Sequence, residues 1–354
     1  MKNPDLTSKS VYYQLADLFE IAAIYHHGPR LFFRARPWPY VERGEALATV
    51  RQRLTTAGFK ADITEEGDGF LIVVGSQGGF RIPRLNIILF LATLVTMFFA
   101  PAILTFDLNY FNQPGAVADR VEFTIALMAI LLFHEFGHYL AGRRRGVLMS
   151  LPYFIPAPNI VGTFGAVIKS RSPFTNRRDL IEVGAAGPIA GFVVAVAALM
   201  YGLQQAAIVP IGSHEGLWLG YSLLIKFLSW LVVGPLPDGY DYVLGPAAFA
   251  GWVGLLVTMI NLLPLGQLDG GHIIYGLIGR WQHKISRVFL VAMMILGFWW
   301  AGWWFFGVLV FLFGINHPPT YNDDKKLPLP ARVMGIASLV IFVISFIPMP
   351  FRMG

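Results

Sequence analysis

The residues best suited to chemistry in this chain are His134, Glu135 and His138, which form the pattern His-Glu-Phe-Gly-His. They lie inside an apolar segment of helical length, 121–142. Ionisable side chains are expensive to bury in a bilayer, so they usually mark a function there. Histidines four residues apart face the same side of a helix and can bind one zinc ion, while the intervening Glu acts on a metal-bound water. The pattern therefore predicts a metallopeptidase site at membrane depth.

A catalytic zinc needs a third protein ligand and one open position. The best candidate is Asp269, in the stretch Asn-Leu-Leu-Pro-Leu-Gly-Gln-Leu-Asp-Gly-Gly that begins at Asn261. Its Pro and three Gly should break a helix, and such breaks occur in membranes where the freed backbone is buried in protein or lines a wet cavity. Two alternatives stay open: Asp269 as a helix N-cap, and His272, one turn later, as a competing ligand, although we favour a packing role for His272.

A third element is the stretch Gly-Pro-Ile-Ala-Gly, which contains Gly187, Pro188 and Gly191. Small residues four apart let transmembrane helices approach each other closely. The stretch predicts that its helix packs tightly against the metal-bearing helix.

Composition excludes an ordinary soluble domain, because the mean hydropathy is +0.58 and only 14% of the residues are charged. Several runs are long enough to cross a hydrocarbon core of about 30 Å. They are 87–106, 121–142, 180–203, 245–263, 288–315 and 334–347. The net charge of +6 fits basic cytoplasmic faces and not a nucleic-acid partner, because the basic residues flank apolar spans. The absence of Cys excludes disulfides and thiolate metal sites.

Topology follows from the distribution of Lys and Arg. Residues 1–85 carry eleven and 143–178 carry seven, whereas 203–217 and 235–245 carry none. The positive-inside bias places the first two regions in the cytoplasm and the last two outside. The run 217–233 is then re-entrant or interfacial. We expect a mainly α fold: a polytopic membrane helical bundle of about six spans plus this possible re-entrant segment.

The run 288–315 is longer than one span requires, because a single helix over it would measure about 42 Å. Either it tilts strongly, or it folds back near Ala301 and Gly302 as two short helices. The sequence leaves both possibilities open.

Residues 1–85 form a separate region, predicted as a small cytoplasmic α+β domain ahead of a transmembrane metalloprotease domain over 86–354. The first apolar run begins only near residue 86, so we do not expect a cleaved signal peptide. Periodicity and turn residues indicate local elements. They are an amphipathic helix over 11–24, a strand over 31–36, a helix over 42–58 and a hairpin over 59–64 and 70–74.

Taken together and in this order, the three stretches resemble the site-2 protease family of intramembrane zinc metalloproteases, over about residues 85–315. The resemblance implies that His134, His138 and Asp269 bind one catalytic Zn²⁺ and that Glu135 is the catalytic base. It also implies that Asn261 faces the substrate or the developing oxyanion.

The stretch 162–167 resembles the family's membrane-associated hairpin, which offers an edge strand to an extended substrate. The substrate-binding residues implied are Gly162, Thr163, Phe164, Gly165, Ala166 and Val167. No insertion large enough for a PDZ domain separates the two metal-binding stretches, so the resemblance is to a branch without one. Because a transmembrane helix shields its own amides and must unwind before hydrolysis, we expect the substrate to be a single-span membrane protein with a breakable helix, cut near the cytoplasmic side. We expect the protein itself to lie in a lipid bilayer, as a multi-pass protein of a prokaryotic cell membrane, and the positive-inside bias predicts a cytoplasmic N-terminus.

Two other functions compete. Other membrane zinc metallopeptidases, acting on soluble or lipidated substrates, share the His-Glu pattern but usually have Glu or His as third ligand. A metal transporter would use the same ionisable residues as a transit site, but the halves of this chain show no internal repeat. The substrate, the pathway, the role of the N-terminal domain and the oligomeric state are not determined by the sequence.

Overall fold

The computed structural model describes residues 6–27, 30–76, 82–105, 108–147, 149–170, 174, 176–212, 217–320, 323–324 and 326–353. The chain is mainly helical, with an antiparallel sheet near its N-terminus. It divides into two compact units. One comprises Met1–Pro83, Tyr139–Leu151 and Ile168–Thr175, and the other Arg84–His138, Pro152–Val167 and Asn176–Gly354. The predicted domain boundary at residue 85 and the cytoplasmic location stay predictions.

The first unit is built on a four-stranded antiparallel sheet in the order β1-β2-β4-β3. Its elements are α1 (Leu6–Leu15), β1 (Phe19–His27), β2 (Arg30–Pro37), α2 (Arg43–Thr56), β3 (Phe59–Glu66) and β4 (Gly69–Ser76). Helix α2 buries Ala46, Val50 and Leu54, which are four residues apart and so share one face. Alternate strand residues such as Phe33 and Ile72 complete this core.

The predicted helix over 11–24 is wrong in its second half. Helix α1 ends at Leu15, and the following residues pair with β2 as strand β1. A register shift between Ile21 and Ala23 interrupts the two-residue alternation, which hides the strand from a periodicity argument. Pairing satisfies the backbone groups at the edge of β2, so tertiary contacts override the local helical pattern.

The second unit contains the remaining helices. They are α3 (Arg84–Thr105), α4 (Ala116–Arg145, whose last turns belong to the first unit), α5 (Arg177–Leu203), α6 (Leu223–Val232), α7 (Pro246–Asn261), α8 (Asp269–Ile278), α9 (Gln282–Leu296), α10 (Gly302–Phe313), α11 (Leu329–Ser345) and the short η1 (Leu108–Asn112) and η2 (Gly279–Trp281). Three small sheets join them, made of β5 (Tyr153–Pro156) with β6 (Thr163–Val167), β7 (Ala207–Pro210) with β9 (Tyr240–Val243), and β8 (Leu217–Leu219) with β10 (Phe351–Met353).

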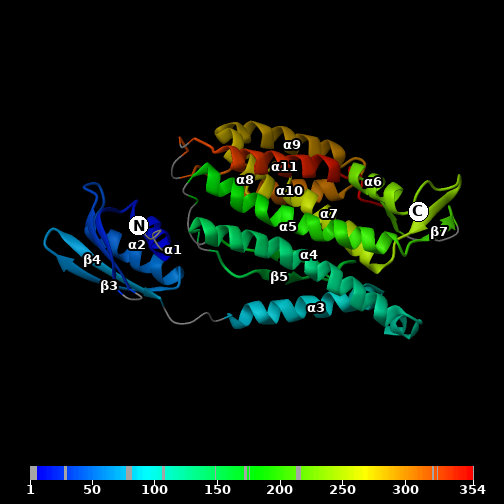
Figure 1. The fold of residues 1–354 in the computed structure, drawn as a ribbon, viewed down its shortest axis with the longest axis horizontal. Coiled ribbons are helices and arrows are strands. Elements are labelled where there is room, and N and C mark those ends of the chain that lie inside the picture. Colours follow the sequence, from blue (N-terminus) through cyan, green and yellow to red (C-terminus); the bar gives the residue numbers. More distant parts are fainter. Residues whose placement is uncertain are drawn as a thin grey trace. The chain divides into compact units, whose positions relative to one another are not determined.

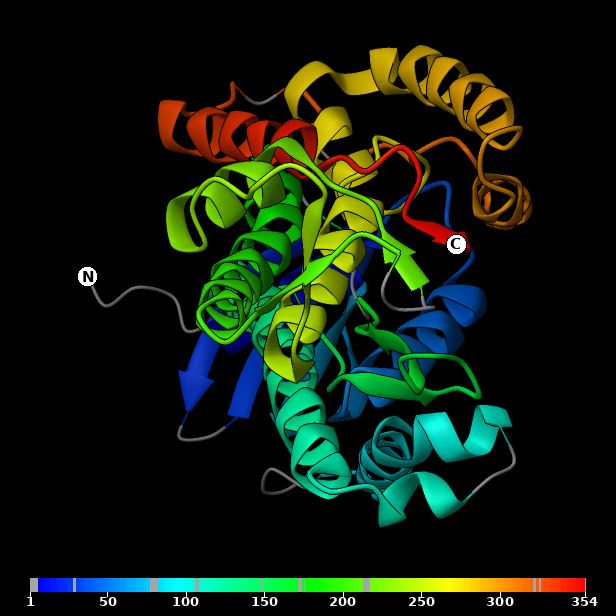
Figure 2. The same cartoon turned by 90° about the vertical axis from the view of Figure 1, so that its right-hand side faces the viewer.

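In the described part of the chain, α3 and α5 are long and apolar enough to cross a membrane, and α6, α7, α10 and α11 are shorter apolar helices. Helix α5 is central to the unit, because it packs against α7, α8 and α11 (Figure 1 and, end-on, Figure 2). Glycines permit this approach: a Cβ on Gly251 of α7 would meet the backbone of Leu199 on α5. The core of the unit lies along this contact, with Leu199, Ala248 and Met259 fully buried.

The structure resolves the alternative left open for 288–315, which forms two helices. Helix α9 ends at Leu296 and α10 begins at Gly302. The two helices contact each other, and the indole N–H of Trp304 donates a hydrogen bond of 2.9 Å to the carbonyl of Met294. In the 217–233 run, α6 has only ten residues. It is about 15 Å long, half the thickness of a hydrocarbon core.

Candidate metal centre

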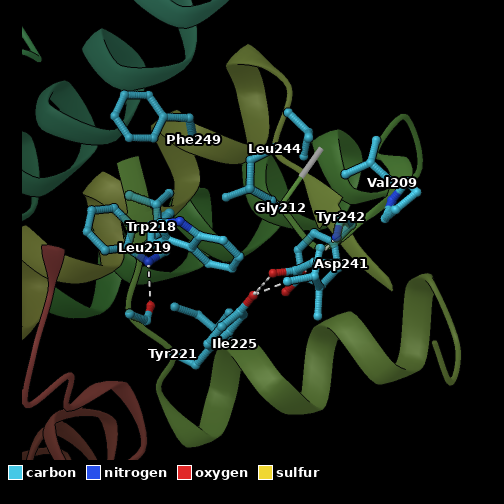
Figure 3. A pocket seen from close by; sticks show the side chains of 15 residues that line it. Val209, Gly212, Trp218, Leu219, Tyr221, Ile225, Asp241, Tyr242, Leu244 and Phe249 are labelled. Carbon is cyan, nitrogen blue, oxygen red and sulfur yellow. Dashed lines mark hydrogen bonds between the residues drawn. The ribbon is translucent and has the colours of Figure 1, made fainter. Parts of the chain in front are cut away.

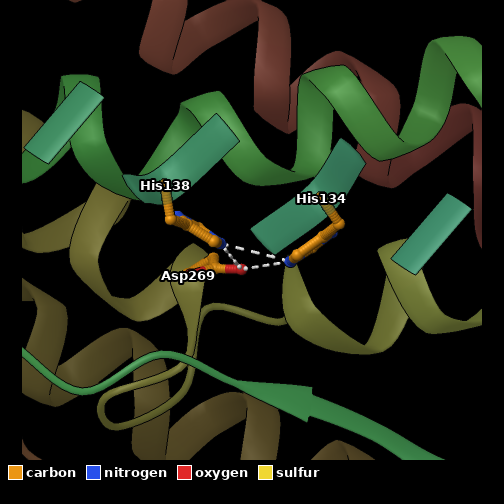
Figure 4. Close-up of side chains that lie close together, drawn as sticks. All are labelled: His134, His138 and Asp269. Atoms are coloured by element: carbon orange, nitrogen blue, oxygen red, sulfur yellow. Dashed lines mark hydrogen bonds and ion pairs between the residues drawn. The ribbon is translucent and has the colours of Figure 1, made fainter. Parts of the chain in front are cut away.

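Three of the predicted residues converge at one point inside the second unit (Figure 4). The Oδ2 atom of Asp269 lies 3.4 Å from Nε2 of His134 and 3.3 Å from Nε2 of His138. The two Nε2 atoms are 3.2 Å apart. Both histidines are buried, and the Asp269 side chain is 17% exposed. Among the described residues, these three form the group of His, Cys, Asp and Glu side chains that could hold a metal ion.

The three donor atoms fit a zinc ion. With bonds of about 2.0–2.2 Å and tetrahedral angles, neighbouring ligand atoms lie roughly 3.3–3.6 Å apart. The three separations in this triangle, 3.2 to 3.4 Å, are close to that range. Two imidazole nitrogens and one carboxylate oxygen are also a donor set of catalytic zinc sites, which leave the fourth position open. A cation between these three atoms would offset the repulsion between their lone pairs and the negative charge of the carboxylate.

Helix α4 positions both histidines. Their spacing of four residues puts the rings one above the other on one face. Nδ1 of His138 lies 2.8 Å from the carbonyl oxygen of Val183 on α5. A carbonyl oxygen only accepts hydrogen bonds, so Nδ1 of His138 is the donor. In a neutral ring, Nε2 then carries a lone pair that faces His134 and Asp269. No sequence signal marks Val183 for this role, because its contribution is a backbone atom.

Helix α5 lies directly behind these rings. A Cβ on Gly187 would run into the imidazole of His138, and one on Gly191 would lie 3.1 Å from Cβ and Nδ1 of His134. Pro188 is buried in the same turn of α5 and removes one N–H from the helix. Sequence reasoning missed Gly137, which lies against the backbone of α5. An interior helical glycine is itself a signal, since it lowers helix propensity and so needs a packing reason.

The break between α7 and α8 positions Asp269, which is the first residue of α8. Gly266 adopts a φ of +52°, a conformation that glycine allows without strain. A Cβ on Gly270 would meet the carbonyls of Leu262 and Leu263, and one on Gly271 the carbonyls of Leu265 and Gly266. The glycine pair thus lets the first turn of α8 pack onto the break. An aspartate there is also favoured by the positive end of the helix dipole.

The other predicted site residues differ in how they are placed relative to the group His134, His138 and Asp269. Asn261 is the last residue of α7, and its Nδ2 is 3.4 Å from Nε2 of His134. Glu135 is buried on α4 beside His134, with 5% exposure. The alternative ligand His272 is not part of this group, and its Nδ1 lies 2.6 Å from Nε2 of His317.

The predicted hairpin contains β6, which pairs antiparallel with β5 from Val167 opposite Tyr153 to Thr163 opposite Pro156. Gly162 has a φ of +80° and lies against the backbone of α3, where Thr96 donates a hydrogen bond of 2.6 Å to the Gly162 carbonyl. Phe164 is 69% exposed. In the described residues this sheet has two strands, so the other edge of β6 carries no strand.

Comparison with known proteins agrees with this geometry. The family model described as "Peptidase family M50" matches residues 122–300, about half of the chain. The chain belongs to this family. The match contains all three metal-site residues, Glu135 and Asn261. The predicted family is thereby confirmed, and it is a family of intramembrane zinc metalloproteases. The group His134, His138 and Asp269 is consistent with the zinc site of such a family.

Curated relatives are described as probable zinc metalloproteases. The chain is 31% identical over 263 residues to a "Probable zinc metalloprotease EGY2, chloroplastic" of Oryza sativa subsp. indica, covering 69% of this chain and 45% of the relative. It is 29% identical over 278 residues to the Arabidopsis thaliana protein of the same name, covering 74% and 48%. An Arabidopsis thaliana "Probable zinc metalloprotease EGY1, chloroplastic" is 29% identical over 262 residues, covering 68% and 47%. The chain thus spans about half the length of these relatives. No solved structure matches.

Proposed function

We propose that this protein is an intramembrane zinc metalloendopeptidase that hydrolyses peptide bonds within or near the transmembrane segment of single-span membrane proteins. The observation that carries the proposal is the convergence of two buried histidines from α4 and the Asp269 carboxylate from α8, in a unit made of apolar helices. The protein would be a multi-pass protein of a prokaryotic cell membrane, with about six spans and a cytoplasmic N-terminus.

His134, His138 and Asp269 would hold the zinc ion. When bound, zinc supplies Lewis acidity, which lowers the pKa of a coordinated water toward about 7 and polarises a carbonyl group. Glu135 takes the proton of the attacking water and later gives it to the leaving amine. Asn261 is close enough to His134, at 3.4 Å, for its side-chain N–H to serve the oxyanion at the same centre.

A transmembrane helix shields its own amides, so the substrate has to unwind before hydrolysis. The open edge of β6 would accept the unwound segment as an added strand, which satisfies the released backbone groups. Such an edge favours a substrate whose helix is easily broken near the cytoplasmic side.

The variant Glu135→Gln tests the catalytic part of the proposal. It keeps the volume of the side chain but removes the base, so zinc content should persist while cleavage of a model single-span substrate falls by about 10²–10⁴-fold. Glu122→Gln, near the start of the same helix, is the matched control and should cleave normally. Retained turnover in Glu135→Gln would remove Glu135 from the base role.

The substrate class needs a separate assay. A helical single-span substrate in proteoliposomes is compared with an unfolded soluble peptide of the same sequence around the cut. Cleavage of the soluble peptide alone would favour a metallopeptidase of another kind, and zinc flux into the liposomes without proteolysis would favour a transporter.

A further inference from the structure

A cavity of about 530 Å³ lies in the second unit away from the metal centre (Figure 3). It is lined by residues of β7, β8 and β9, of the segments next to them and of the first turns of α6 and α7. Its walls are mainly apolar and include the aromatic side chains of Trp218, Tyr221, Tyr242, Phe249 and Trp252. The volume is within the range of small-molecule sites, which are typically apolar with a few placed polar groups.

Asp241 is the charged residue among the described residues that line this cavity. Its Oδ1 accepts a hydrogen bond of 2.8 Å from the backbone N–H of Tyr242 and one of 3.2 Å from the hydroxyl of Tyr221. Within the described ranges, its Oδ2 has one longer contact of 3.5 Å with the same hydroxyl (Figure 3). A carboxylate oxygen accepts more than one hydrogen bond, so Oδ2 has capacity for a further donor.

A smaller hollow of about 270 Å³ adjoins the cavity and shares Tyr221, Asp241 and Tyr242 with it. Lys226, on α6, lines this hollow as well. No ion pair joins Lys226 to Asp241 in the described part of the chain, although both face the same space. The two neighbouring hollows therefore present one negative and one positive group side by side.

Helix α6 also has a face suited to lipid. Leu223, Phe227, Trp230 and Leu231 are each more than half exposed, whereas Ile225 and Leu228 are buried. A short helix with an exposed apolar and aromatic face is typical of segments that lie in the membrane interface. The cavity and its two charges thus adjoin a surface that acyl chains would cover.

We propose that Asp241 and Lys226 bind the headgroup of a zwitterionic phospholipid, with its ammonium on Asp241, its phosphate on Lys226 and its acyl chains along the exposed face of α6. The two opposite charges complement such a headgroup, whereas the carboxylate repels an anionic lipid. An ethanolamine headgroup suits Oδ2 best, because its ammonium donates hydrogen bonds, and the aromatic walls favour the cation further. This site is independent of the proteolytic function.

Lipid retention by the full chain tests the proposal. The purified protein is incubated with equal amounts of palmitoyl-oleoyl phosphatidylethanolamine, phosphatidylcholine and phosphatidylglycerol, and bound lipid is measured by native mass spectrometry. We expect one phosphatidylethanolamine retained per chain in preference to phosphatidylglycerol. Asp241→Asn and Lys226→Gln should each lower this retention about tenfold, the effect of losing one charge-assisted hydrogen bond. Asp238→Asn, in the exposed turn before β9, is the matched control and should behave as the wild type.

Asp241→Asn and Lys226→Gln change residues in different elements, so a folding defect in one does not imply a defect in the other. In Asp241→Asn the side-chain carbonyl oxygen would still accept the hydrogen bond from the Tyr242 N–H, and Lys226 is an exposed side chain, so at least one variant should fold normally. Retention of phosphatidylcholine that is lost in both variants also supports a zwitterion site. Equal retention of phosphatidylglycerol, equal retention of phosphatidylethanolamine by wild type and both variants, or no retained lipid would each overturn the proposal.

Discussion

Replacing Gly187 by Ala should release zinc without changing any ligand. The added Cβ would enter the space of the His138 imidazole, with Nε2, Cδ2 and Cε1 as its nearest neighbours. The ring cannot simply turn away, because Nδ1 is held by the Val183 carbonyl at 2.8 Å. Either the ring or helix α5 has to move.

The size of the effect follows from the contact distances. Ordinary van der Waals contact is about 3.5–4.0 Å, so the ring would have to shift by roughly 1.5 Å. Metal sites tolerate departures of only about 0.2 Å in ligand distance. Disturbing the orientation of a ligand typically lowers metal affinity by about 10–100-fold, which corresponds to roughly 1.4–2.7 kcal/mol. Overpacking should lower the free energy of unfolding by about 1–3 kcal/mol in addition.

The assay is a zinc competition titration with a chromophoric chelator on the purified protein, together with a thermal unfolding curve that reports whether the variant is folded. Gly245→Ala is the matched control, because a Cβ there meets nothing within 4 Å, and it should bind zinc as the wild type does. A folded Gly187→Ala protein with wild-type zinc affinity would refute the idea that contact with α5 sets the position of His138.

Three further predictions concern the other parts of the structure. Asp269→Ala should lose bound zinc and proteolytic activity, measured by elemental analysis and by substrate cleavage, whereas the control His272→Ala should keep its zinc. Full zinc occupancy in Asp269→Ala would point to another third ligand. Asn261→Ala should retain zinc but lower kcat by about 10²–10³-fold with little change in KM, because the lost hydrogen-bond donor serves only the oxyanion. An unchanged kcat in steady-state kinetics would contradict this role. Leu54→Ala removes a fully buried side chain from the N-terminal core and should lower the free energy of unfolding of that unit by about 2–5 kcal/mol in denaturant titrations, while an exposed substitution such as Arg51→Ala on the same helix should have little effect.

Features of this protein that depend only on neighbouring residues could be predicted from its sequence. The helical period alone puts His134 and His138 on one face, and the apolar runs predict helices that the structure contains at 84–105, 177–203 and 246–261. Proline and glycine predict the break before Asp269, because these residues act on the backbone at their own positions. Such features need no information about distant parts of the chain.

Other features depend on residues far apart in the sequence. Strand β1 exists because β2 offers an edge for pairing, and a bulge hides its alternation. The apolar run 288–315 is compatible with one long helix or two short ones, and the contact between the Trp304 indole and the Met294 carbonyl stabilises the two-helix arrangement of α9 and α10. In both cases the local pattern was compatible with another structure, and contacts with a neighbouring element decided between them.

The same division applies to the metal centre. Residue type and spacing, together with the family resemblance, pointed to two histidines and a distant carboxylate as candidate ligands. Only the packing of both α4 and α8 against α5 brings Asp269 within 3.4 Å of both rings and puts the Val183 carbonyl against His138. A ligand's chemistry belongs to its own side chain, but a distance of a few ångströms between residues more than a hundred positions apart is set by how whole helices pack.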